Sequence, residues 1–281
     1  MITDIERHYN LLGIGGGATD DEIVAAYKKL ALRYHPDKNP HRVEWATEAM
    51  TQINLAYSAV MSHRFRTESI RPSEGPPPPE EKKTTPQAGK TVVDSEVLTG
   101  QFINHREGAK DSLYRYYQYS LYRLTIREKM ANRAIFNKIV FALRKSYHAI
   151  HRLARLTDDP ELIEHFEVFT VMLINFYRAS ECLNIIDSYA NQYDVEAYRI
   201  YKQGDEDLTI AGKEIFYDRH NRGYFKLDMA YEHLIRAEKT FSANLKVFPK
   251  SSWAVETGIK LEFVQSLRKY IELFFSDYTR P

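Results

Sequence analysis

The chain has a single cysteine, Cys182, among its 281 residues. One thiol cannot form an internal disulfide, and zinc modules built on cysteine pairs need several sulfurs. Long apolar runs are also missing. The longest, residues 166–177, is about half the roughly 20 residues that a membrane-spanning helix needs, and it contains Glu167 and Asn175. The N-terminal segment lacks the basic and apolar regions of a signal peptide. We therefore expect a soluble, cytoplasmic protein.

Neither sign of charge dominates, because 39 Lys and Arg stand against 38 Asp and Glu, for a net charge of +1. The distribution is nevertheless uneven. Residues 111–156 hold ten basic and two acidic residues, whereas residues 157–214 hold thirteen acidic and four basic ones. A basic helix followed by an acidic one favours side-by-side packing of the two. A basic surface for a nucleic acid or another polyanion is the alternative. Its cations would be Arg115, Arg123, Arg127, Arg133, Lys138, Arg144 and Lys145.

Proline is scarce outside one segment. Six of the 11 prolines fall in residues 71–90, which contain no aromatic residue and no aliphatic residue larger than Ala88. Such a segment cannot bury enough apolar surface to offset the entropy of ordering it. We therefore predict a Pro-rich linker over residues 71–90, between an N-terminal domain of residues 1–70 and a C-terminal domain of residues 91–281.

Two amphipathic helices are predicted before the linker. The sequence Thr19-Asp20-Asp21-Glu22 is a capping box that begins the first helix. Apolar residues then recur at spacings of three and four, which leaves Lys28, Lys29 and Arg33 on the solvent side. Pro36 ends this helix because it lacks an amide hydrogen and disfavours helical geometry in the residue before it. A second helix with a facing apolar stripe completes an antiparallel hairpin. The stripes are Ile23, Tyr27, Leu30, Ala31 and Tyr34, and Ala46, Ala49, Met50, Ile53, Ala56, Tyr57 and Val60.

Residues 91–281 contain almost no strand signal and few prolines or glycines, which allows long helices. The apolar pattern from Leu113 to Leu153 predicts one long helix or two in succession. Asp159-Pro160-Glu161 predicts a new helix start, and breaks are expected near Gly204, Gly223 and Pro249. Five or six helices with short connections predict an antiparallel bundle, so we expect an all-α chain.

The bundle offers no complete set of metal ligands. His148 and His151 are three residues apart, but a di-metal carboxylate bundle needs paired Glu-x-x-His motifs on two helices, and none is present. We therefore predict no metal, no other cofactor and no catalytic residue, and we expect that the protein is not an enzyme.

The tripeptide His35-Pro36-Asp37 follows the first basic helix directly. In this context, the N-terminal domain resembles the J domain of DnaJ-type co-chaperones. The matching segments are Tyr9-Asn10-Leu11-Leu12-Gly13, Thr19-Asp20-Asp21-Glu22-Ile23, Ala26-Tyr27-Lys28-Lys29-Leu30-Ala31, Arg33-Tyr34-His35-Pro36-Asp37-Lys38-Asn39-Pro40 and Ile53-Asn54-Leu55-Ala56-Tyr57. Together they cover about a quarter of the sequence.

The resemblance implies a protein that stimulates ATP hydrolysis by a DnaK-type seventy-kilodalton heat-shock chaperone. Carried over from the family, the basic helix would face an acidic surface on the chaperone's ATPase domain. Asp37 would engage an arginine of the chaperone, and His35 would hold the turn and contact the partner. The chaperone-binding residues implied in this way are Lys28, Lys29, Arg33, His35, Pro36, Asp37 and Lys38.

Three departures from the family pattern affect what the resemblance implies. The connection at residues 13–18 is rich in glycine, and Met50 stands where the family usually has Phe. Residues 62–66 replace the usual short closing helix. The chain also lacks a long Gly/Phe stretch and the zinc region, so it is similar to the third class of J proteins, in which the remainder of the chain selects a client or a location. The alternative is a scaffold or polyanion-binding protein with a vestigial J module, which would use the basic residues between positions 115 and 155.

Overall fold

We describe the fold from a computed structural model, which describes residues 4–67, 94–182 and 192–275. All regular structure within these ranges is helical, which confirms the predicted all-α class. The predicted linker, residues 71–90, lies outside the described residues.

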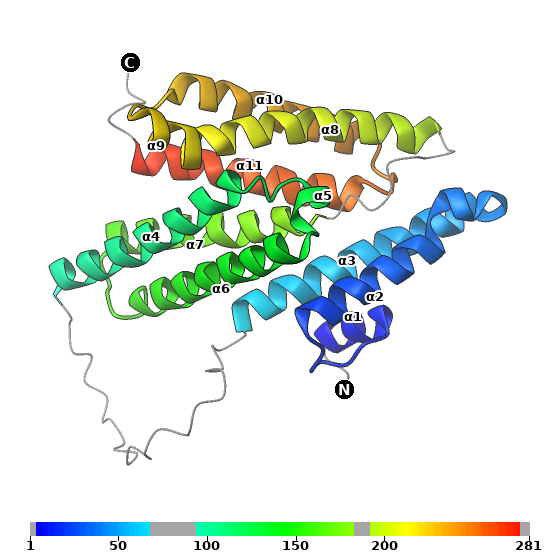
Figure 1. The fold of residues 1–281 in the computed structure, drawn as a ribbon, viewed down its shortest axis with the longest axis horizontal. Coiled ribbons are helices and arrows are strands. Elements are labelled where there is room, and N and C mark those ends of the chain that lie inside the picture. The colour runs from blue at the N-terminus through cyan, green and yellow to red at the C-terminus, as the bar shows by residue number, and fades with distance from the viewer. Residues whose placement is uncertain (1–3, 68–93, 183–191, 276–281) are drawn as a thin grey trace, which may run out of the picture.

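The N-terminal part consists of three helices, α1 (Asp4–Leu12), α2 (Asp20–Tyr34) and α3 (Val43–Thr67). Two short 3-10 turns, Pro36–Lys38 and Pro40–Arg42, connect α2 to α3. Helices α2 and α3 lie against each other and α1 packs on α3, so the predicted hairpin is confirmed (Figure 1). Helix α3 continues unbroken through residues 62–66, the segment that replaces the family's short closing helix.

The C-terminal part is a bundle built mainly of long helices. Helix α4 packs on α6, α7 on α11, and α8 on α10 (Figure 1). Ten of the 21 residues of α7 are buried. The helices of the bundle are α4 (Ser95–Gln118), α5 (Leu124–Arg127), α6 (Met130–Leu153), α7 (Pro160–Ser180), α8 (Gln192–Lys213), a π-helical turn (Glu214–Asp218), α9 (Arg219–Arg222), α10 (Leu227–Val247) and α11 (Ala254–Phe274).

Several predicted helix boundaries are confirmed and one is wrong. The carboxylate of Asp159 accepts a 3.0 Å hydrogen bond from the amide of Glu161 at the start of α7. Gly223 ends α9 in the left-handed conformation, with φ +78°. The break expected near Gly204 does not occur, because Gly204 lies inside α8. A β-carbon there would lie 2.7 Å from the ring of Phe241, so this glycine allows α10 to approach α8 closely rather than ending the helix.

The N-terminal hairpin lies against the bundle through α3, which contacts α6, α7 and α11. Near the C-terminal end of α3, the Phe65 ring stacks on Tyr177 of α7 at a centroid distance of 4.6 Å and meets Tyr147 of α6 edge-on. The opposite end of the hairpin, which carries the connection between α2 and α3, projects beyond the bundle (Figure 1). The hairpin therefore lies on the bundle with the C-terminal half of α3 and extends past the bundle at the end that carries the connection.

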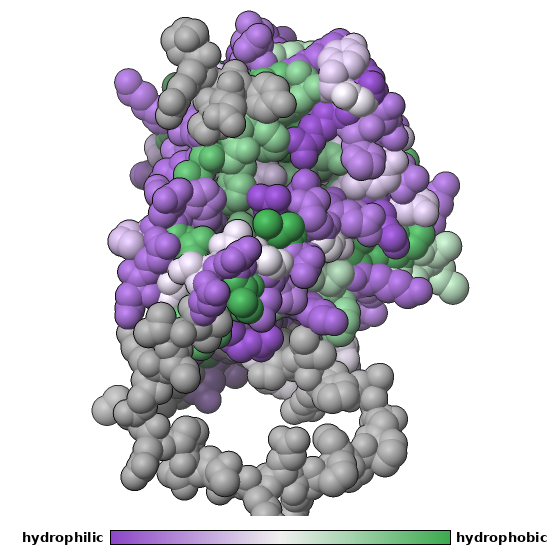
Figure 2. Space-filling model, turned by 90° about the vertical axis from the view of Figure 1, so that its left-hand side faces the viewer, coloured by the Kyte–Doolittle hydropathy of each residue, from purple (hydrophilic) through white to green (hydrophobic). Residues whose placement is uncertain are grey.

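Figure 2 shows hydrophilic side chains over most of the viewed face, with apolar side chains between them. Within the described ranges, every helix is too short or too polar to cross a membrane.

Candidate functional site

Hydrogen bonds fix both ends of helix α2, the helix that carries the basic residues. At the N-terminus the capping box is complete: the Glu22 amide donates to the Thr19 hydroxyl (3.2 Å), and the Glu22 carboxylate accepts from the Thr19 amide (2.7 Å). The hydrogen bond from the Thr19 amide lowers the pKa of Glu22. Of the predicted apolar stripe, Ile23, Tyr27 and Ala31 are buried, whereas Leu30 and Tyr34 are partly buried and pack against the core.

The other end of α2 stops before Pro36. His35 is extended, with φ −62° and ψ 136°, and its carbonyl oxygen accepts a 3.0 Å hydrogen bond from the Lys38 amide. The Asn39 side chain donates to the carbonyls of both Arg33 (3.0 Å) and His35 (2.9 Å). Asn39 therefore ties the turn to the last carbonyls of the helix, a role that its place in the matching segment did not reveal.

The residues of the tripeptide differ in exposure. The side chain of His35 is 2% exposed, and Pro36 is also buried. Both therefore hold the turn in place in this conformation. Lys38 is exposed. Asp37 lies in the 3-10 turn, and its side chain is outside the described part of the structure.

The three cations on α2 are not equivalent. Lys29 and Arg33 are exposed, as predicted. Lys28 is only partly exposed, because its ammonium group pairs with the carboxylate of Glu128 at the end of α5. One cation of the predicted chaperone-binding set is therefore engaged by the bundle.

The seven cations of the predicted polyanion surface occupy different environments. Arg127 is 7% exposed and Arg144 is 9% exposed, so both belong to the interior. The Arg127 guanidinium donates a 2.5 Å hydrogen bond to the Ser180 carbonyl and lies over the Phe136 ring. Arg133 is partly exposed. The remaining four are exposed: Arg115, Arg123, Lys138 and Lys145.

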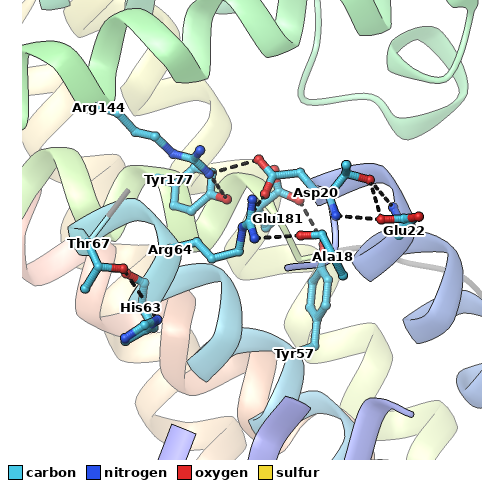
Figure 3. Close-up of polar contacts among 11 residues, drawn as sticks. Ala18, Asp20, Glu22, Tyr57, His63, Arg64, Thr67, Arg144, Tyr177 and Glu181 are labelled. Atoms are coloured by element: carbon cyan, nitrogen blue, oxygen red, sulfur yellow. Dashed lines mark hydrogen bonds and ion pairs between the residues drawn. The ribbon is translucent and has the colours of Figure 1, made fainter. Parts of the chain in front are cut away.

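Two arginines of the basic segment form ion pairs with the start of α2. Arg133 lies 2.5 Å from the carboxylate of Asp21, and Arg144 lies 3.0 Å from that of Asp20. Arg64 of α3 binds Asp20 from the other side, at 2.7 Å, as Figure 3 shows. Helix α6 does lie beside the acidic helix α7, as the charge pattern predicted. Its arginines, however, also bind the N-terminal hairpin, which that pattern did not indicate.

A cavity of about 480 Å³ separates α2 from the bundle at these ion pairs. Apolar side chains of both parts line it, including Val24, Met61 and Val140, and Arg144 reaches into it from α6. Because the cavity leaves this side of the interface incompletely packed, α2 meets the bundle mainly through long charged side chains.

On the other side of the hairpin, two buried carboxylic acids face its tyrosines. Glu181 accepts a 2.9 Å hydrogen bond from the Tyr57 hydroxyl (Figure 3). Burial raises the pKa of Glu181, while the charge of Arg127 opposes that rise. Burial also raises the pKa of Glu256 to about 8. No cluster of three or more metal-ligating side chains occurs within the described ranges.

Comparison with known proteins identifies the N-terminal part. Residues 7–68 match the DnaJ domain family. An uncharacterised J domain-containing protein of Schizosaccharomyces pombe is 41% identical over 69 residues, 24% of this chain and 18% of that protein. The chaperone protein DnaJ of Prosthecochloris aestuarii is 51% identical over 53 residues, 19% of this chain and 13% of that protein. DnaJ homolog subfamily B member 8 of Mus musculus is 40% identical over 61 residues, 22% of this chain and 27% of that protein.

Residues 7–68 therefore form a DnaJ domain, as the tripeptide and its flanking helices predicted. From here on we call α1–α3 the J domain and α4–α11 the bundle. The aligned stretches span at most 27% of these three relatives' own lengths, and the family match does not extend into the bundle. No solved structure matches the chain.

Proposed function

We propose that this protein is a J-domain co-chaperone, which recruits a DnaK-type seventy-kilodalton heat-shock chaperone and stimulates its ATP hydrolysis. The observation that carries the proposal is the turn at residues 35–37, which Asn39 fixes at the end of α2 and which projects beyond the bundle. Lys29 and Arg33, four residues apart on α2, and Lys38 in the turn are all exposed.

The chemistry of these residues suits a transient contact. Exposed cations speed association with an acidic surface and give an affinity that salt weakens, so the complex can dissociate after each cycle. A carboxylate at position 37 would fix the orientation of the complex by pairing with an arginine of the chaperone. The protein itself would break no bond, because the hydrolytic groups belong to the chaperone.

We propose that the bundle binds a client or a targeting partner. Attachment to such a partner would raise the local concentration of the J domain beside it, so that a chaperone arriving there is triggered in place.

The decisive measurement is single-turnover ATP hydrolysis by a purified DnaK-type chaperone in the presence of the full chain. We expect wild-type protein to accelerate hydrolysis, and His35→Gln and Asp37→Asn to lose most of the acceleration. Asp111→Asn, which alters an exposed carboxylate on α4, is the matched control and should behave like wild type. Equal stimulation by all four proteins, or none by the wild type, would refute the proposal.

The second candidate function is polyanion binding through the basic segment. Four exposed cations there favour it, whereas burial of Arg127 and Arg144 removes two of the seven that it would use. Binding to a polyanion such as heparin should weaken steeply as salt rises if this function is real. Binding that is absent, or indifferent to salt, would eliminate it.

A further inference from the structure

The contact between the J domain and the bundle involves the surface that the proposed function requires to be accessible. Lys28 belongs to the predicted chaperone-binding set, yet Glu128 of the bundle already pairs with it. Glu128 is a carboxylate, the same kind of group that an acidic chaperone surface would offer to Lys28. The bundle therefore occupies part of the predicted chaperone-binding surface, and it does so with a carboxylate like those expected on the chaperone.

The two sides of the J domain are held differently. On the α3 side, Phe65 packs between Tyr147 and Tyr177, and this burial of aromatic rings contributes an apolar anchor. On the α2 side, the contact consists of side-chain ion pairs that border an open cavity. The Asp21–Arg133 pair is solvent-exposed on both partners, so it contributes little to stability and is sensitive to salt.

We infer that the bundle restrains its own J domain, because α2 is held on α5 and α6 by the Lys28–Glu128, Asp21–Arg133 and Asp20–Arg144 pairs and must be released before a chaperone can use Lys28. This inference rests on the proposed function. The apolar anchor at Phe65 keeps the J domain attached to the bundle while α2 loosens. An acidic chaperone surface would exchange for Glu128 at Lys28, so chaperone binding and release of α2 are coupled.

Selective labelling of lysines in the full chain measures the release directly. N-hydroxysuccinimidyl acetate acylates accessible amines, and the adjacent Lys29 is exposed whether or not α2 is held, so it serves as an internal reference. Arg133→Gln and Asp21→Asn each remove one partner of the second ion pair and leave Glu128 in place. We expect either variant to raise the labelling ratio of Lys28 to Lys29 by about two- to fivefold, the range that an exposed ion pair accounts for.

The double variant tests whether the two residues act as a pair. If the ion pair carries the effect, Arg133→Gln combined with Asp21→Asn raises the ratio no further than either single change. Glu164→Gln, an exposed carboxylate on α7 away from the interface, is the control and should leave the ratio unchanged. A ratio in both single variants equal to that of the wild type would overturn the inference.

Stimulation of the chaperone's ATP hydrolysis tests whether release of α2 from the bundle affects the proposed co-chaperone function. At a subsaturating concentration, Arg133→Gln and Glu128→Gln should stimulate ATP hydrolysis more strongly than wild type, whereas Glu164→Gln should not. Raised Lys28 labelling without raised stimulation would disprove the regulatory role. Adding His35→Gln to Arg133→Gln separates the two proposals: loss of stimulation upholds the J-domain function, and retained stimulation refutes it independently of the restraint.

Discussion

The hydroxyl of Tyr57 in the J domain donates a 2.9 Å hydrogen bond to the carboxylate of Glu181, which follows the last helical residue of α7 in the bundle. The two residues are 124 positions apart in the sequence, and both are buried. Tyr57 also stacks on Tyr27 at a centroid distance of 4.2 Å, so the contact continues into the core of the J domain. The J domain and the bundle therefore share a polar contact in a region from which water is largely excluded.

Loss of the Tyr57 hydroxyl should destabilise the full chain. Tyr57→Phe keeps the ring but leaves the buried Glu181 carboxylate without this donor, and we expect it to lower the free energy of unfolding by about 1–3 kcal/mol. Urea denaturation followed by circular dichroism measures the change. Tyr119→Phe removes a hydroxyl from an exposed ring on the bundle and should cost less than about 0.5 kcal/mol. Similar values for the two variants would show that the Glu181 contact contributes nothing.

The adjacent residues Asp20 and Asp21 should differ in their contributions to stability. Asp20 pairs with both Arg64 and Arg144, whose side chains are largely buried, whereas Asp21 pairs only at the surface with Arg133. We expect Asp20→Asn to cost about 1–3 kcal/mol, because it weakens hydrogen bonds to two buried guanidinium groups. Asp21→Asn should cost less than about 1 kcal/mol. The two variants share the same helix turn and the same charge change, so equal losses in urea denaturation would contradict the assignment of Asp20 as the partner of two buried arginines.

Stability should fall as pH rises towards 8, because of Glu256. Its pKa in the folded protein is about 8, whereas an exposed glutamate has a pKa of about 4.3. Between these values the folded chain keeps a proton that the unfolded chain has released, so the free energy of unfolding decreases with pH. Above pH 8 both states are ionised and this contribution no longer changes.

Glu256→Gln removes the titration and should flatten the profile between about pH 5 and pH 8. Urea denaturation at several pH values measures the slope. Burial raises the pKa of Glu181 as well, so a smaller slope of the same sign remains in the variant. Glu164→Gln alters an exposed carboxylate and should retain the wild-type slope. A Glu256→Gln profile as steep as that of the wild type would mean that another group controls the pH dependence.

Local patterns in the sequence predicted the J domain well because its structure depends on neighbouring residues. The capping box at Thr19, the stop at Pro36 and the apolar spacing of α2 and α3 each act within a few residues. The same holds in the bundle for the helix start at Asp159. These elements required no knowledge of the tertiary fold.

Contacts between distant residues could not be predicted in the same way. Nothing in the sequence around Glu128 identifies Lys28, 100 positions away, as its partner, and nothing around Glu181 identifies Tyr57, 124 positions away. The acidic start of α2 and the basic segment around Arg133 were a usable signal, because opposite charges favour contact. Gly204 shows the opposite problem: as a glycine it suggested a helix break, but tertiary packing against Phe241 explains it.

Gly212 should be the least tolerant of the helical glycines in the bundle. A β-carbon there would lie 2.0 Å from the hydroxyl oxygen of Tyr117 and 2.7 Å from its Cζ atom, so α8 approaches the buried Tyr117 ring too closely for any side chain. Gly212→Ala must displace that ring from a packed core, and we expect a loss of about 1–3 kcal/mol in the free energy of unfolding. Gly258→Ala in α11 is the matched control, because a β-carbon there meets no atom within 4 Å. That change should be neutral or stabilise by up to about 1 kcal/mol, since alanine favours a helix more than glycine does.

Combining Gly212→Ala with Tyr117→Leu removes the clashing ring, so the two losses should not add. Strict additivity in thermal or urea denaturation would show that Tyr117 is not what excludes a side chain at position 212.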